Sequence, residues 1–176
     1  TVGNPAIQTI VYAVDQYWNR VHPPDPEPRV EITTARYLAV DPANPWTLSS
    51  GEATFQTTLK TAATGQILVA RDQITGIGDS SKIDVNPGDF VKLQIVAPDE
   101  IPDPGSDLGK TGTIQSQVAG VSFDLAVRAV DQYWNLVPTI NGESIDLTSQ
   151  KDIGLDSRYT PKPFVGGVVS FRIWLD

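Results

Sequence analysis

Apolar and polar residues alternate in short runs along this chain, and clusters of proline and glycine separate the runs. Val, Ile, Thr and aromatic residues dominate these runs, which is typical of half-buried β-strands. No window places apolar residues at i, i+3, i+4 and i+7 between helix caps, so we expect no helix. The pattern therefore predicts an all-β fold built from sandwiches.

The alternating runs predict the following strands: residues 6–14, 29–34, 52–60, 66–71 and 81–85, then 90–97, 123–129, 144–149 and 169–175. Val30, Ile32, Phe55 and Leu59 should point inward. Residues 98–112, rich in Pro, Gly and Asp, should form a loop.

The run at 90–97 has a distinct apolar side. Val91, Leu93 and Ile95 fall on one face of the predicted strand, and Lys92 and Gln94 fall on the other. Such a strand should open the second half of the chain.

One heptad occurs twice. Ala-Val-Asp-Gln-Tyr-Trp-Asn occupies residues 13–19 and again residues 129–135, an offset of 116 residues. The motif Gly-x-(Ala/Val)-x-Phe-x-x-x-Leu, which begins at Gly51 and at Gly167, keeps the same offset. Two matches in one register indicate a tandem repeat.

The repeat divides the chain into residues 1–87 and 88–176, with Asn86-Pro87-Gly88 as the turn between them. Collating the copies, we expect the first unit to lack its opening strand and the second to lack its last two strands. Each unit alone would expose a sheet edge. Since Thr1 begins in mid-pattern, we expect a segment of a longer array; strand addition from neighbouring chains is the alternative.

Composition excludes several classes of protein. The 176 residues contain 21 Asp and Glu against 13 Lys and Arg, for a net charge of −8 without a basic patch. This argues against nucleic acid as a partner. The chain has no cysteine, which excludes disulfides, zinc–thiolate sites and a cysteine nucleophile. No apolar run approaches the roughly 18 residues of a membrane span, so no membrane insertion is expected in this segment.

Catalysis finds little support in the sequence. His22 is the single histidine, lies in a proline-rich loop, and corresponds to Pro138 in the second copy. A Ser–His–Asp arrangement would need this residue, and neither a Gly-x-Ser-x-Gly elbow nor a phosphate loop occurs. We expect that the protein is not an enzyme.

The heptad predicts a turn that closes a strand. The carboxylates of Asp15 and Asp131 can accept hydrogen bonds from backbone N–H groups two residues further on. Asn19 and Asn135 tolerate a left-handed conformation, which suits the close of each turn.

We expect no cofactor in this protein. Calcium is the one ion whose binding the sequence leaves open. Calcium prefers six to eight oxygen ligands, usually from several carboxylates, and the heptad offers one. Asp99, Asp103 and Asp107 are weak metal candidates, although their proline-containing loop also suits a solvated linker.

The motif Ala-Val-Asp-x-x-x-Asn-x-Val, at 13–21 and 129–137, resembles that of bacterial Ig-like repeats of large surface proteins. The typical family pattern is Ala-x-Asp-x-x-Gly-Asn-x-Val. Residues 51–60, with the Thr-Ala-Ala-Thr-Gly-Gln that follows, resemble the penultimate strands of this family. The likeness covers nearly the whole chain and implies tandem immunoglobulin-like sandwiches. Trp18 and Trp134 stand where relatives usually have Gly, so we expect a turn other than the tight glycine form.

The aromatic pairs Tyr17-Trp18 and Tyr133-Trp134 allow three interpretations. The tryptophan could fold over the end of the sandwich and close the core. The pair could instead form a contact between successive units, because exposed aromatic residues are costly without a partner. A carbohydrate-stacking platform is the third interpretation.

These observations favour a structural repeat module of a bacterial extracellular or cell-surface protein: a filament, sheath, surface layer or adhesin stalk. Its expected partners are neighbouring copies of the same repeat, in a tandem array or a homopolymer. The alternative is a ligand-binding module, such as an adhesin tip or a carbohydrate-binding accessory domain of a secreted enzyme.

Overall fold

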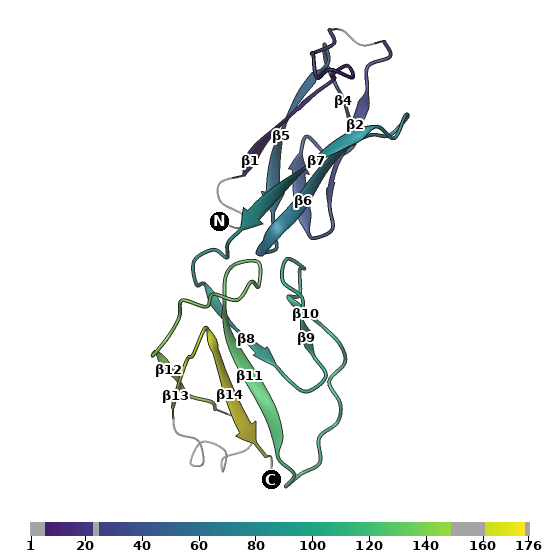
Figure 1. Ribbon diagram of the computed structural model, residues 1–176. Helices are drawn as coiled ribbons and strands as arrows, with labels where there is room; N and C mark the ends of the chain where they lie inside the picture. The colour runs from purple at the N-terminus through teal and green to yellow at the C-terminus, as the bar shows by residue number, and fades with distance from the viewer. Residues whose placement is uncertain (1–5, 23–24, 149–160, 175–176) are drawn as a thin grey trace. The chain divides into compact units, whose positions relative to one another are not determined.

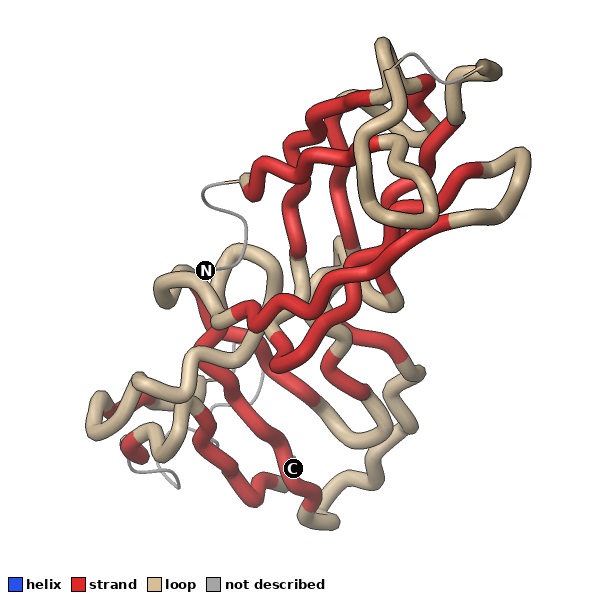
Figure 2. Tube along the Cα trace, turned by 45° about the horizontal axis from the view of Figure 1, so that its top comes forward, coloured by secondary structure: helices blue, strands red, loops and turns tan. Residues whose placement is uncertain are grey.

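The computed structural model describes residues 6–22, 25–148 and 161–174. Every regular element in these ranges is a β-strand and none is a helix, as Figures 1 and 2 show. The predicted all-β class is confirmed. The chain divides into two compact units, Thr1–Asn86 and Pro87–Asp176, one residue before the boundary expected from the sequence.

Unit 1 contains two antiparallel sheets. The first has the order β1-β5-β3, with β1 at Ile7–Tyr12, β3 at Leu38–Asp41 and β5 at Glu52–Leu59. The second has the order β4-β2-β6-β7, with β2 at Arg29–Thr34, β4 at Trp46–Thr47, β6 at Ala63–Asp72 and β7 at Gly78–Val85. The first sheet buries Phe55 and Leu59, and the second buries Val30, Ile32 and Leu68. Both sheets thus contribute to one core, which is an arrangement of β-sandwich type.

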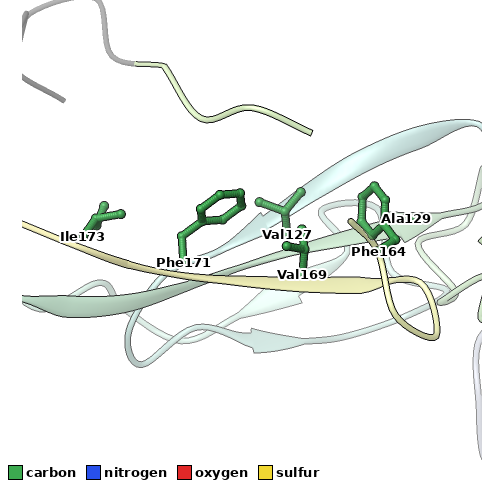
Figure 3. Close-up of a cluster of buried hydrophobic side chains, with 6 residues drawn as sticks. All are labelled: Val127, Ala129, Phe164, Val169, Phe171 and Ile173. Atoms are coloured by element: carbon green, nitrogen blue, oxygen red, sulfur yellow. The ribbon is translucent and has the colours of Figure 1, made fainter. Parts of the chain in front are cut away.

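Unit 2 is built around the three-stranded sheet β14-β11-β8. Its strands are β8 at Lys92–Val96, β11 at Phe123–Val130 and β14 at Val168–Ile173. Two short antiparallel pairs accompany it: β9 at Ile101–Pro102 with β10 at Lys110–Thr111, and β12 at Ser144–Ile145 with β13 at Lys162–Pro163. Figure 3 shows the buried cluster that this sheet forms with Phe164, which follows β13: Val127, Ala129, Phe164, Val169, Phe171 and Ile173.

The two copies have the same main strand pairing. Ile7 pairs with Thr57 in unit 1, and the residues 116 positions later, Phe123 and Ile173, pair in unit 2. Phe55 and its counterpart Phe171 are both fully buried. The sequence repeat is therefore a structural repeat in its strand register, because a slip of one residue would turn each phenylalanine to the opposite face.

Several strands differ from the prediction. The short strands β3, β4, β9 and β10 were not expected, and the last two fall inside the predicted loop at 98–112. The strand expected at 144–149 is confined to Ser144–Ile145, and residue 149 lies outside the described residues. Strands of two to four residues carry too few alternating positions to be recognised without their pairing partners.

In β8, the opening strand of unit 2, the apolar face is exposed and the polar face is partly buried, contrary to the usual pattern. Leu93 pairs with Ala129 and Ile95 with Val127, so both apolar side chains share a face with buried residues of β11. Nevertheless Leu93 and Ile95 are about half exposed, whereas Gln94 on the opposite face is buried. The Gln94 side chain donates to the carbonyl of Gly109 at 2.7 Å, which explains how a polar side chain is accommodated there.

The shared position of the two buried phenylalanines yields a stability prediction. Phe171→Ala and Phe55→Ala should each lower the free energy of unfolding of their own unit by about 3–5 kcal/mol, because each leaves a cavity in a packed core. Ile74→Ala is the control, since this side chain is exposed. Denaturant unfolding followed by circular dichroism, with hydrogen exchange to assign the unit, measures the effect. A loss below about 1 kcal/mol for either phenylalanine would contradict the assigned core.

Candidate functional site

The repeated heptad forms the same hydrogen-bonded turn in both units. In unit 2 the Asp131 carboxylate Oδ1 accepts the backbone N–H of Tyr133 at 2.8 Å and that of Asn135 at 2.9 Å. The Asn135 amide donates to Oδ2 at 3.0 Å. Both Asp131 and Asn135 are buried. One carboxylate therefore organises the whole turn, as an Asx turn with additional donors.

Unit 1 reproduces this geometry on the surface. Asp15 Oδ1 accepts the backbone N–H of Tyr17 at 2.8 Å and that of Asn19 at 2.9 Å, and the Asn19 amide donates to Oδ2 at 3.0 Å. Asp15 and Asn19 are exposed. The turn geometry is thus set by the local sequence and is independent of burial.

The left-handed residue of each turn is the tryptophan. Trp18 has φ 66° and Trp134 has φ 68°, whereas the asparagines are not among the residues with positive φ. The left-handed conformation that Asn tolerates thus falls on the residue before it, and the expectation of a turn other than the glycine form is wrong. The physical reason is that the Asp carboxylate holds the N–H groups on both sides of the tryptophan, which forces the strained conformation between them.

In unit 2 the partly buried Trp134 side chain contacts the segment 87–112, which we call the arm. The Lys92 ammonium lies 3.4 Å from the centre of the indole ring, a cation–π contact. The indole N–H donates to the carbonyl of Asp107 at 3.3 Å. Gly109 lies so close that a Cβ there would be 2.2 Å from the ring, so this position requires glycine.

Backbone N–H groups of the arm also form hydrogen bonds to the turn and to the end of β11. The N–H of Gly88 donates to Asp131 Oδ2 at 2.9 Å, and the N–H of Val91 donates to the carbonyl of Val130 at 3.0 Å. The N–H of Gly105 donates to the carbonyl of Tyr133 at 2.7 Å. A single continuous segment therefore forms hydrogen bonds to the turn of unit 2 at three places.

Unit 1 has no such cover among the described residues. Tyr17 is 74% exposed and Trp18 is 72% exposed. The interpretation that this tryptophan closes the core is wrong for Trp18. In unit 2, Trp134 rests on the arm and is not part of the core cluster.

The weak metal candidates do not form a cluster. No group of three or more His, Cys, Asp or Glu side chains suited to a metal ion occurs in residues 6–22, 25–148 and 161–174. Asp99 and Asp107 are exposed. Asp103 lies in a backbone turn, where its carbonyl accepts the hydroxyl of Ser106 at 2.8 Å. These three aspartates all lie in the arm, the segment that contacts Trp134.

His22 lies on the surface of unit 1. Its Nδ1 is 2.6 Å from the carbonyl oxygen of Ser50, so the ring nitrogen donates to the backbone. Among the described residues, no serine hydroxyl or carboxylate forms a hydrogen bond with this ring. This contact fastens the loop after the heptad to the turn that precedes β5.

The arm residues were missed at the level of sequence. Gly88, Lys92 and Gly109 occur in a segment present once in the chain, so comparison of the two copies could not mark them. The signal that could have pointed to them is the glycine-rich end of the loop, because repeated glycines permit close approach of another group.

Comparison with family models, with curated proteins and with solved structures finds no significant match. Among the described residues no helix is long and apolar enough to cross a membrane.

The two tryptophans provide a matched pair of substitutions. Trp134→Gly should lower the free energy of unfolding of unit 2 by about 1–3 kcal/mol, because the lost ring contacts exceed the relief of backbone strain. Trp18→Gly should leave unit 1 unchanged or stabilise it by up to about 1 kcal/mol, because glycine accepts a positive φ without strain. Thermal unfolding combined with hydrogen exchange of β1 and β11 measures both. Equal losses in the two units would contradict the difference in cover.

The Asp15 carboxylate yields a prediction on pH. The Asn19 side chain, followed by the backbone N–H groups of Asn19 and Tyr17, lowers the pKa of Asp15 below its ordinary value of 3.8. Its contribution to unit 1 is then complete above pH 3.8 and is lost as the pH falls through the lowered pKa. Titration of the carboxyl carbon by NMR should show the lowered pKa. Asn19→Ala should move this pKa back toward 3.8, and an unchanged pKa would refute the assigned cause.

Proposed function

We propose that this chain is a structural repeat module of a bacterial extracellular assembly: a filament, sheath, surface layer or adhesin stalk. In this proposal each unit is an immunoglobulin-like sandwich; the first lacks its opening strand and the second lacks its last two strands. The observation that carries the proposal is the second occurrence, 116 residues later, of the same turn on the same pair of strands.

Several properties support a mechanical role. Repeated units with the same strand register suit a chain that lengthens by a constant increment with each copy. The net charge of −8 favours solubility of a long exposed protein. A chain without cysteine depends on core burial alone, as in the clusters around Phe55 and Phe171.

A ligand-binding module is the second candidate, and one observation favours it. Tyr17 and Trp18 are adjacent, exposed and held in a rigid turn, which suits stacking on a sugar ring. An adhesin tip or an accessory domain of a secreted polysaccharide-degrading enzyme would use such a surface.

Immuno-electron microscopy tests the proposal, with antibodies raised against this chain and applied to the cells that produce it. We expect label along filaments or a layer outside the cell envelope. Label confined to the cell interior would refute the proposal. A polysaccharide binding screen tests the second candidate: retention that is lost in Trp18→Ala and kept in Trp46→Ala would favour a binding module.

A further inference from the structure

The two units differ most in what covers the repeated turn. Val14 is 40% exposed, whereas its counterpart Val130 is fully buried. Val21 is 37% exposed, whereas its counterpart Val137 is 5% exposed. These two valines and Trp18 are exposed side chains of one turn, and we call them the turn patch of unit 1.

In unit 2 the arm pairs with the strand that leads into the turn, as far as Val130, and contacts Trp134. Strand β8 of the arm pairs with β11 antiparallel, from Ala126 opposite Val96 to Val130 opposite Lys92. In unit 1, the counterpart strand β1 pairs with β5 and with no other described strand. The outer edge of β1 is therefore unpaired within the described chain, and an unpaired edge favours the addition of a further strand.

The edge of β1 presents the same backbone groups that β11 uses. Ala13 and Ala129 both donate their N–H to the inner neighbour, to Gly51 and Gly167 respectively, at 2.8 Å. Because hydrogen bonding alternates along an antiparallel strand, the N–H groups of Ile10 and Tyr12 face the outer edge. The geometry that receives the arm thus exists in unit 1 before anything binds.

The turn in unit 1 is also prepared for the arm. Asp15 keeps the hydrogen bonds of Asp131 within the turn, and Trp18 keeps the left-handed backbone of Trp134. In unit 2, the carboxylate additionally accepts the Gly88 N–H, and the ring additionally contacts Lys92 and Gly109. These are the interactions that an incoming segment would add.

We propose that the turn patch and β1 edge of unit 1 bind the opening segment of another copy of the repeat, with the chemistry of residues 87–112. This segment adds a strand to β1, donates a backbone N–H to Asp15, and places a lysine and a glycine against Trp18. The inference rests on the proposed function, since it names the joint through which successive copies are connected.

A peptide corresponding to residues 87–112, added to the full chain, tests the proposal. We expect saturable one-to-one binding and protection of the Ile10 and Tyr12 amides from hydrogen exchange. Trp18→Ala should weaken binding at least about tenfold, because a central buried aromatic residue dominates such contacts. Trp46→Ala is the matched control, since this tryptophan is also exposed in unit 1 but lies on β4; it should leave binding unchanged.

A second peptide keeps the test independent of the folding of any variant. The peptide carrying Gly109→Ala should bind at least about tenfold more weakly, because its Cβ would overlap the indole ring. Equal binding of both peptides, or protection of amides elsewhere than on β1, would overturn the proposal. Self-association of the chain that Trp18→Ala abolishes, without peptide binding, would also overturn it, because the patch would then pair with itself.

The outcome is separable from that of the proposed function. If the peptide does not bind but antibodies label an extracellular assembly, the joint is wrong and the structural role stands. If the peptide binds but the label lies inside cells, the joint stands and the assigned role is wrong.

Discussion

The interaction on which the rest of the structure depends is that between one aspartate carboxylate and the backbone of its own turn. Each carboxylate accepts two backbone N–H groups and a side-chain amide within five residues. A charged acceptor forms stronger hydrogen bonds than a neutral one, so it can hold a tryptophan in a left-handed conformation. The chain then returns beside its own strand, where Val21 bonds to Ala13 and Val137 to Ala129.

Comparison of the two copies distinguishes the turn geometry that the local sequence sets from the burial that the arm adds. The hydrogen-bond distances agree within about 0.1 Å although one aspartate is exposed and the other is buried. Local interactions are therefore sufficient for the turn, and the arm contributes burial and contacts to the indole ring. A surface that is already in its bound conformation loses little entropy when a partner arrives, which favours binding.

The arm also determines which face of β8 is buried in unit 2. In unit 2 it buries Gln94 on the outer face and leaves Leu93 and Ile95 half exposed on the face that carries the core. Apolar side chains aligned with a core but open to solvent are unfavourable in isolation. The exposed face of Leu93 and Ile95 therefore suits packing against a further apolar segment.

Much of this protein follows from sequence alone. Period-two alternation around Phe55 and Phe171 predicts strands because side chains of a strand alternate between two faces. The repeated heptad predicts one register and an aspartate-centred turn, since these depend on neighbouring residues. Tertiary structure alone decided that β3 pairs with β5 and β4 with β2, and that Gly109 and Lys92 lie against Trp134. These contacts join segments far apart in the chain, and the arm occurs once in it, so comparison of the two copies could not indicate them. The glycines of the loop indicate a close approach but not the group that approaches.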